Sequence, residues 1–212
     1  MRKKYVFFDL DGTLTDSGEG IIKCAALALE HFGLPVPDGE TMREFVGPPL
    51  GDTFQRFGVP ANKVDEAIAV YRSRYLSVGK FENFPYPGIP QVLKTLQERG
   101  YRLFVATSKP EETSVEILEH FGLDKYFDVI AGASFDGARS SKSSVIAYLL
   151  SQVAEAESIT MVGDTAFDVL GAKAHGIPTI GAAWGYGKVE ALEAAGAIAI
   201  ADNPQALLEL LI

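Results

Sequence analysis

The sequence is poor in cysteine, tryptophan and basic residues. Its 212 residues include one cysteine and one tryptophan. A single cysteine, Cys24, cannot form an internal disulfide, and this favours a reducing compartment. Lysine and arginine number 19 against 28 aspartate and glutamate residues, so the formal net charge is −9. Because binding to a nucleic-acid polymer needs a basic face, we expect no nucleic-acid partner.

Long hydrophobic runs are also missing. No apolar stretch approaches the ~20 residues of a membrane-spanning helix, so we expect no membrane partner. The first apolar run, residues 5–8, is cut by Asp9 at about half the length that a secretory signal needs. We therefore expect a cytoplasmic protein. Its 47% hydrophobic and 22% charged residues are typical of globular chains.

Short apolar runs recur along the chain and are separated by helix-length segments. The runs do not alternate apolar and polar residues, which is typical of strands covered on both faces. The pattern predicts an α/β fold, a parallel sheet with helices on both faces. The predicted strands are residues 5–8, 102–106, 128–131, 159–162, 178–180 and 197–200.

One long gap interrupts this alternation. Residues 16–80 contain helical patterns and no convincing strand, which predicts an all-helical domain inserted after the first strand. Residues 81–90 contain three prolines and a glycine and are interpreted as the return hinge. We therefore expect a catalytic core of residues 1–15 and 81–212, with residues 16–80 as a separate helical domain.

Two aspartates, Asp9 and Asp11, directly follow the first predicted strand. In an open parallel sheet, ligands bind beyond the carboxyl ends of the strands. Residues i and i+2 of an extended segment face the same side, so the two carboxylates converge. At ~4 Å they repel by about 4 kcal/mol at an effective dielectric of 20. A cation, a proton or a division of chemical roles must relieve this repulsion.

A second acidic pair, Asp164 and Asp168, follows the predicted strand at 159–162. The two residues are one helical turn apart and share a face. Taken alone, Asp164 is equally well interpreted as a helix N-cap. Acids at two strand ends are nevertheless what a hard divalent cation prefers, because they supply oxygen ligands from separate elements.

Two further strand ends carry polar groups. Thr107 and Ser108 offer a hydroxyl and free backbone N–H groups at an expected helix start, which is typical of an anion site. A plain capping turn is the alternative. Lys142 stands at the head of another predicted helix, which is an unfavourable place for a cation. A solvated surface lysine is the alternative there.

The order of these motifs resembles the haloacid dehalogenase superfamily of hydrolases with a helical cap. The motifs are residues 9–14 (Asp-Leu-Asp-Gly-Thr-Leu), then Thr107 and Ser108, then Lys142, then residues 163–164 (Gly-Asp) with Asp168. The resemblance covers essentially the whole chain. It implies a Rossmann-like core, with the insertion at 16–80 as the cap domain.

For the acidic residues, the resemblance implies a phosphatase that acts through an aspartyl phosphate. Asp9 is the implied nucleophile, and Asp11 the general acid and then the general base. Mg²⁺ is the implied cofactor, held by the side chains of Asp9 and Asp164 and the carbonyl of Asp11. Asp168 is implied to support either the metal shell or Lys142.

For the other core residues, the resemblance implies phosphate binding. Thr107, the backbone of Ser108, and Lys142 are expected to hold the phosphoryl oxygens, with Thr107 and Lys142 counted as catalytic. Positioning and charge neutralisation would then supply most of the catalysis.

The expected substrate is a small phosphorylated metabolite, chosen by the cap. Residues 47–50 (Gly-Pro-Pro-Leu) and 135–139 resemble the branch named phosphoglycolate phosphatase or 5′-nucleotidase. A loop at 47–50 is expected to approach the active site, although a simple connection between helices is equally compatible with its sequence. The candidate substrate contacts are Arg43, Gly47, Pro48, Lys109 and Arg139.

Three alternatives can be weighed from the sequence. A β-phosphoglucomutase-like sugar phosphomutase shares the core motifs and a similar cap, so the motifs do not separate it from a phosphatase. A receiver domain is disfavoured, because it is shorter and has no helical insert. Residues 181–187 are glycine-rich, but they lack a Gly-Lys-Ser run and do not follow the first strand, so a nucleotide cofactor is not expected.

Overall fold

A computed structural model describes residues 4–134, 137–153, 156 and 158–212. The chain divides into two units. The first combines Met1–Thr15 with Pro85–Ile212, and the second is Asp16–Phe84. The chain therefore returns to the first unit four residues later than the predicted boundary at 81. Residues 135 and 136 of the 135–139 stretch lie outside the described residues.

The first unit is built on a six-stranded sheet in the order β5-β4-β1-β6-β7-β8. Every pairing in it is parallel, so the predicted α/β fold is confirmed. Strand order reverses beside β1, which places a topological switch point at its carboxyl end. The strands are β1 (Lys4–Phe8), β4 (Arg102–Pro110), β5 (Val129–Ala133), β6 (Ser158–Gly163), β7 (Thr179–Ala182) and β8 (Ala199–Ala201).

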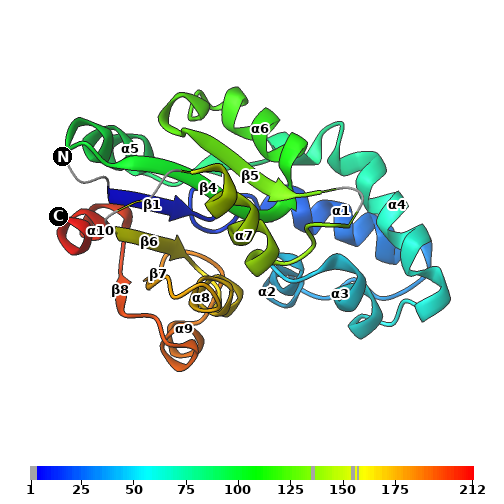
Figure 1. Cartoon of the computed structure of the whole chain (residues 1–212). Helices are drawn as coiled ribbons and strands as arrows, with labels where there is room; N and C mark the ends of the chain where they lie inside the picture. Colours follow the sequence, from blue (N-terminus) through cyan, green and yellow to red (C-terminus); the bar gives the residue numbers. More distant parts are fainter. Residues whose placement is uncertain (1–3, 135–136, 154–155, 157) are drawn as a thin grey trace. The chain divides into compact units, whose positions relative to one another are not determined.

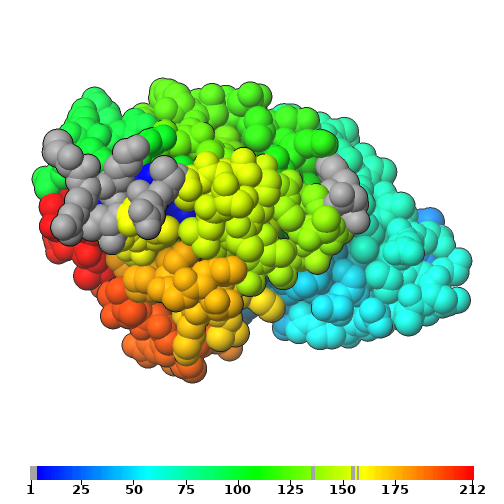
Figure 2. All heavy atoms as spheres, viewed as in Figure 1, coloured from blue at the N-terminus to red at the C-terminus, as the bar shows by residue number. Residues whose placement is uncertain are grey.

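Helices pack on both faces of this sheet (Figure 1). On one face, β1 and β4 contribute apolar side chains to a buried cluster with α5 (Ile89–Glu98), α6 (Glu111–His120) and α10 (Pro204–Leu211). On the other face they pack against α7 (Lys142–Gln152) and α8 (Ala166–Lys173). Figure 2 shows α7 and α8 side by side on the surface. The remaining helices of this unit are η4 (Asp124–Tyr126) and α9 (Val189–Ala195).

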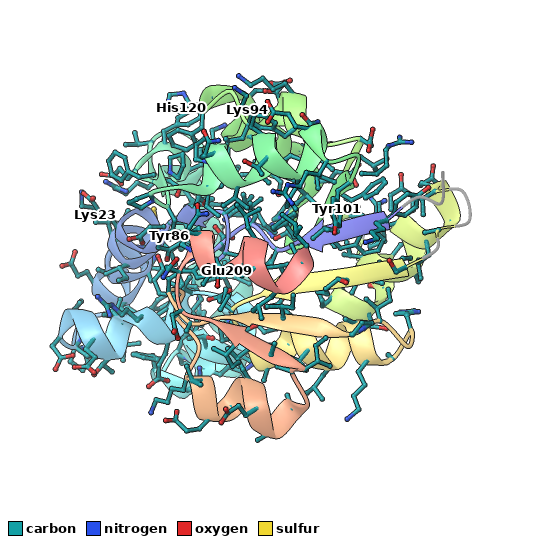
Figure 3. The ribbon with its side chains drawn as sticks, turned by 90° about the vertical axis from the view of Figure 1, so that its left-hand side faces the viewer. Lys23, Tyr86, Lys94, Tyr101, His120 and Glu209 are labelled. Atoms are coloured by element: carbon teal, nitrogen blue, oxygen red, sulfur yellow. The ribbon has the colours of Figure 1, made fainter. Side chains whose placement is uncertain are left out.

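The carboxyl-terminal helix is tied to the loop that leads into β4. The hydroxyl of Tyr101 donates a hydrogen bond to the carbonyl oxygen of Leu211 in α10. Figure 3 shows Tyr101 on the side of the first unit where α10 lies. This bond holds the last helical turn against the sheet, because that turn lacks intrahelical partners for its carbonyl groups.

Strand β4 is longer than the sequence predicts. It runs to Pro110 and not to residue 106, with an irregular register between Ala106 and Pro110. A residue before proline is disfavoured in the helical region, so the backbone at Lys109 stays extended and α6 begins only at Glu111. Thr107 and Ser108 therefore lie within the strand and not at a helix start.

The second unit is helical apart from its ends. At the two points where the chain passes between the units, β2 (Thr15–Asp16) and β3 (Phe84–Pro85) form a separate two-stranded sheet, which the sequence does not predict. The helices are α1 (Gly18–His31), α2 (Gly39–Met42), η1 (Arg43–Phe45), α3 (Leu50–Arg56), η2 (Ala61–Lys63), α4 (Val64–Tyr75) and η3 (Gly79–Phe81).

Aromatic side chains form much of the interior of the second unit. Phe45 packs on Phe54 and Phe57 at ring-centroid distances of 5.0 and 4.6 Å. The rings of Tyr71 and Tyr75 stack at 5.1 Å. Such contacts bury large apolar areas and favour one packing geometry, so this small helical unit has a defined core.

The second unit also contains an ion cluster that joins α1 and α4 to Glu82, the residue that follows η3. Arg74 donates to both carboxylate oxygens of Glu82, at 2.6 and 3.0 Å. Lys23 bridges Glu82 and Glu19 at 2.8 and 2.6 Å. Arg74 also contacts the sulfur of the buried Cys24 at 3.4 Å. Each carboxylate has a basic partner, so this cluster balances its own charge.

The helices are short. The longest of the described helices, α1, spans Gly18–His31. Within the described ranges, no helix has the length and apolar character needed to cross a membrane.

Candidate active site

Two neighbouring strands of the central sheet end in aspartates. Asp9 follows β1, and its backbone N–H donates to the carbonyl of Val162 in β6 at 2.9 Å. Asp164 directly follows β6. Asp9 is 8% exposed and Asp164 is fully buried. The pairing of β1 with β6 thus brings together two predicted site residues that are far apart in the sequence.

A third buried carboxylate, that of Asp168, completes an acidic cluster. One oxygen from each of Asp9, Asp164 and Asp168 lies within 4.8 Å of the others. Asp168 also belongs to the capping box of α8. Its Oδ2 accepts from the N–H and the hydroxyl of Thr165, at 3.0 and 2.8 Å. The helix cap therefore fixes the orientation of Asp168.

Lys142 lies between two of these carboxylates. Its Nζ is 2.7 Å from Oδ1 of Asp9 and 2.7 Å from Oδ1 of Asp168. It also donates to the carbonyl oxygen of Ala106 at 2.8 Å. The ammonium group thus has three oxygen neighbours, two in ion pairs and one in a hydrogen bond, which together fix its position. These contacts outweigh the unfavourable position of a cation at the first residue of α7.

The close approach of α7 and α8 depends on Gly171. A Cβ at Gly171 would lie 2.6 Å from Cγ of Lys142 and 3.2 Å from the backbone nitrogen of Ser143. Any larger residue at this position would displace the buried stem of Lys142. A glycine in the interior of α8 therefore makes room for the site lysine.

Asp164 is oriented by two neutral donors. Its Oδ1 accepts from the Thr13 hydroxyl at 3.1 Å. Its Oδ2 accepts from the backbone N–H of Tyr186 at 2.8 Å. Neither bond brings a positive charge, so the carboxylate stays available for a cation.

Burial and mutual repulsion make the ionised forms of the buried carboxylates unfavourable. Burial, followed by the charge of Asp168, raises the pKa of Asp9 to about 7 from an ordinary value of 3.8, although Lys142 opposes the shift. Burial and the charges of Asp168 and Asp9 raise the pKa of Asp164 well above its ordinary value. Burial opposes the charge of Lys142, but Asp168 and Asp9 outweigh it and raise its pKa. The positive charge of Lys142 is therefore too small to balance the negative charges of the buried carboxylates.

Asp11 has a basic partner of its own. Its Oδ2 is 2.7 Å from Nζ of Lys109, and both side chains are largely buried. Its Oδ1 is buried and makes no hydrogen bond to the described residues. Gly12 turns the chain sharply after Asp11 with a φ of 82°, and its N–H donates to the carbonyl of Thr15 at 2.8 Å. The turn places Asp11 beyond the end of β1 with one carboxylate oxygen available.

Two of the predicted phosphate-binding residues, Thr107 and Ser108, are at the end of β4. Thr107 is buried, and its Oγ1 accepts from the N–H of Lys109 at 3.2 Å. Ser108 is exposed. Since Lys142 contacts the carbonyl of Ala106, the end of β4 is joined directly to the acidic cluster.

The remaining candidate substrate contacts are dispersed. Arg139 pairs with Glu111 at 3.0 Å, and its guanidinium lies 3.9 Å from the ring centre of Tyr148. Arg43, Gly47 and Pro48 belong to the second unit, where Arg43 begins η1 and Gly47 has a φ of 101°. Lys109 contacts Asp11, and Arg139 has two partners within the first unit. Their roles toward substrate stay predictions.

Sequence reasoning missed the loop of residues 183–187. Besides the Tyr186 N–H, this loop supplies Nε1 of Trp184, which donates to the carbonyl of Thr13 at 3.0 Å. The spacing of Gly185 and Gly187 on either side of Tyr186, beside the only tryptophan, was the available signal.

Comparison with known proteins fits this geometry. A family model described as haloacid dehalogenase-like hydrolase matches residues 6–182. The chain belongs to the haloacid dehalogenase-like hydrolase family. This confirms the family predicted from the motifs at the four strand ends.

Individual relatives of this family extend over most of the chain. The tyrosine-protein kinase PtkA of Mycobacterium tuberculosis is 47% identical over 189 residues, which cover 89% of this chain. The chain spans only 65% of the length of that relative. A 5′-nucleotidase of Pseudomonas aeruginosa is 41% identical, with 92% of this chain and 89% of the relative covered.

The fold of the family is also found in a solved structure. The crystal structure of a predicted phosphatase from Clostridium acetobutylicum matches with a TM-score of 0.94 and 41% identity. The match covers 100% of this chain and 99% of the other. The Rossmann-like core of the family is therefore confirmed as the fold of this chain.

Proposed function

We propose that this protein is a Mg²⁺-dependent phosphatase that hydrolyses a small phosphate monoester through an aspartyl phosphate on Asp9. The contact of Asp9 with Lys142, beside a buried acidic cluster, carries the proposal. A lone buried carboxylate would be neutral at pH 7, whereas a nucleophile must be ionised. Lys142 lowers the pKa of Asp9 against the effect of burial and so favours the reactive form.

The donor set of the site fits a divalent cation. Four carboxylates, those of Asp9, Asp11, Asp164 and Asp168, face two ammonium groups, which leaves a formal excess of negative charge. The donors are oxygens from separate elements, as Mg²⁺ prefers. Asp9 and Asp164 would hold the ion, together with the carbonyl of Asp11. When bound, the ion supplies positive charge that stabilises the phosphoryl oxygens in the transition state.

Asp168 has a different task in this scheme. Both of its oxygens already have partners, Lys142 on one side and Thr165 on the other. We therefore assign Asp168 to the positioning of Lys142 and not to direct metal binding. Lys142 in turn would contact a phosphoryl oxygen on Asp9.

The reaction takes place in two displacements at phosphorus. An oxygen of Asp9 forms a bond to phosphorus as the bond to the alcohol oxygen breaks, and Asp11 gives a proton to the departing alcohol. Asp11 then takes a proton from a water molecule, whose oxygen displaces Asp9 and releases inorganic phosphate. Asp11 suits both steps because one of its oxygens has no hydrogen-bond partner among the described residues. Thr107, the Ser108 backbone and Lys142 would hold the transferring group.

For the substrate, we propose a small phosphorylated metabolite of the phosphoglycolate or nucleoside 5′-monophosphate type. The relative named 5′-nucleotidase is 41% identical and supports this class. Residues 16–80 would act as the cap that selects it, with Arg43, Gly47 and Pro48 as contacts. Lys109 and Arg139 would act at the rim only if they leave their present partners, Asp11 and Glu111.

A panel of phosphate esters tests this proposal. The purified protein is incubated with Mg²⁺ and phosphoglycolate, nucleoside 5′-monophosphates or glucose 1-phosphate, and released inorganic phosphate is measured. We expect release with wild type and none with Asp9→Asn, and a phosphoryl adduct on Asp9 in acid-quenched samples by mass spectrometry. Glu82→Gln in the second unit is the control and should turn over normally. Conversion of glucose 1-phosphate to glucose 6-phosphate without phosphate release would establish the mutase instead.

One observation favours a second acceptor for the phosphoryl group. The relative that is 47% identical is named a tyrosine-protein kinase, although the chain spans only 65% of its length. As the second candidate, a tyrosine hydroxyl displaces Asp9 from phosphorus in place of water, and its proton passes to Asp11. Incubation with ATP as donor and a tyrosine-containing peptide tests this. Phosphotyrosine that is lost in Asp9→Asn would support the second candidate, and phosphate release alone would reject it.

A further inference from the structure

The loop of residues 183–187 approaches Asp164 more closely than any side chain would allow. A Cβ at Gly185 would lie 2.3 Å from Cβ of Asp164 and 2.4 Å from the carbonyl oxygen of Gly12. A Cβ at Gly187 would lie 1.9 Å from the carbonyl oxygen of Asp164. Neither glycine has a positive φ. These glycines are therefore required for space and not for backbone conformation.

Trp184 connects the same loop to the other donor of Asp164. Its indole Nε1 donates to the carbonyl of Thr13, whose hydroxyl donates to Oδ1 of Asp164. On the opposite side, the N–H of Tyr186 donates to Oδ2. The indole also packs against the buried cluster on the α5 face of the sheet. Both oxygens of Asp164 are thus held, directly or through Thr13, by one loop that is anchored in the core.

We propose that residues 184–187 are positioning residues that fix the carboxylate of Asp164 for the divalent cation. This inference rests on the proposed function, because it assumes that Asp164 is a metal ligand. Partners of a ligand that fix its orientation set metal affinity, since a carboxylate that can rotate must be ordered on binding. Trp184 and Tyr186 supply the orientation, and Gly185 and Gly187 allow the approach.

A connecting loop without this role would behave differently. If the loop only linked β7 to α9, substitutions in it would change the stability of the fold and leave metal affinity unchanged. The affinity for Mg²⁺, measured on folded protein, therefore separates the two roles. Phosphatase turnover is not needed for the measurement.

The experiment is a titration of the metal-free full chain with Mg²⁺ by isothermal calorimetry. We expect Gly185→Ala and Gly187→Ala to weaken Mg²⁺ binding by about 10- to 100-fold, the range for changes in groups that orient a metal ligand. Gly39→Ala is the matched control, because a Cβ there meets nothing within 4 Å and its φ is not positive. It should bind Mg²⁺ as wild type does.

Trp184 provides a milder variant and a second signal. Trp184→Phe keeps most of the ring packing but removes the N–H that reaches Thr13, so we expect weaker Mg²⁺ binding with a smaller loss than for Gly185→Ala. Since Trp184 is the only tryptophan, its emission reports on this loop alone. We expect Mg²⁺ to shift that emission in wild type with the same midpoint as the calorimetric titration.

The outcomes distinguish this inference from the proposed function. Wild-type affinity in folded Gly185→Ala and Trp184→Phe would overturn the positioning role and leave the metal-dependent phosphatase intact. If the glycine variants do not fold, Trp184→Phe decides by the same criterion. If wild-type protein binds no Mg²⁺, both the metal site and the positioning role are rejected. Weaker binding in the loop variants with an unchanged Gly39→Ala control supports the inference.

Discussion

The two units of this protein each contain a cluster of acidic and basic side chains, and the clusters differ in their electrostatics. In the second unit, hydrogen bonds from Arg74 and then Lys23 lower the pKa of Glu82 to about 2. In the first unit, burial and neighbouring acids raise the pKa of Asp9 to about 7, and Lys142 forms an ion pair with it at 2.7 Å. The cluster at Glu82 stabilises the ionised form of its carboxylate, whereas the cluster at Asp9 destabilises it.

This difference separates a structural ion cluster from a functional one. The contacts of Glu82 hold three helical segments together and need nothing further. The acidic cluster at Asp9 is destabilised as it stands, and a protein keeps such an arrangement where a ligand completes it. The raised pKa values of Asp9 and Asp164 therefore agree with the sequence motifs in marking this cluster as the candidate active site.

The largest expected effect comes from Asp9→Asn. Loss of the nucleophile should reduce phosphate release by roughly 10³-fold or more. The metal-free protein should become more stable, because the substitution removes a buried charge that the site opposes. Steady-state kinetics and thermal melts measure the two effects. Retained turnover in Asp9→Asn would contradict the assignment, and Glu82→Gln should show the opposite pattern, normal turnover with lower stability.

The next effect is the response of stability to pH and Mg²⁺. The pKa of Asp9 is higher in the folded state than its ordinary value of 3.8, so its contribution to stability is full below about 4 and is lost as pH rises through about 7. Melting temperature without Mg²⁺ should therefore fall between pH 5 and pH 7.5. Mg²⁺ at about 100 times its Kd should restore about 2.7 kcal/mol at the upper pH. An equal melting temperature with and without Mg²⁺ would count against the metal site.

A smaller effect is expected from Glu82→Gln in the second unit. The pKa of Glu82 is lowered, so its contribution to stability is present above its ordinary value of 4.5 and is lost as pH falls through about 2. We expect a loss of about 1 kcal/mol at pH 7, which disappears near pH 2. Chemical unfolding at both pH values measures it. A loss that stays constant with pH would show that packing, and not charge, is responsible.

The smallest effect is expected at the ion pair of Arg139 with Glu111, which lies in the first unit but resembles the structural cluster. Arg139→Gln and Glu111→Gln should each lower stability by about 0.5 kcal/mol and leave KM unchanged. Urea unfolding and substrate titration give the two values. A KM that rises only in Arg139→Gln would show that Arg139 binds substrate, as the sequence interpretation suggested.

Much of the fold could be predicted because its signals are local. Continuous apolar runs mark all six strands of the sheet, since a strand covered on both faces needs apolar side chains on both. The segments Thr15–Asp16 and Phe84–Pro85 were not predicted, because a two-residue strand is defined by its distant partner and not by its own composition. The predicted end of β4 at residue 106 was wrong, because the apolar run stops there while Pro110 keeps the backbone at Lys109 extended.

The candidate site shows the same division. Asp9, Asp164 and Lys142 could be proposed from sequence because parallel strands place their carboxyl ends at one edge of the sheet. The contact between Lys109 and Asp11 depends on the extended end of β4, which the sequence did not indicate. The role of residues 184–187 depends on how closely their backbone approaches Asp164, where there is no room for a Cβ at Gly185 or Gly187. This approach exists only once the chain is folded.

Gly171 has a consequence for attempts to engineer this protein. Glycine inside a helix costs up to about 1 kcal/mol relative to alanine, so a search for stabilising substitutions would select Gly171→Ala. That substitution would gain helix propensity in α8 and push against the stem of Lys142. Directed evolution for heat resistance would then select a substitution that lowers activity by displacing Lys142, although residue 171 itself contacts neither metal nor substrate. Libraries built for stability should keep residue 171 fixed.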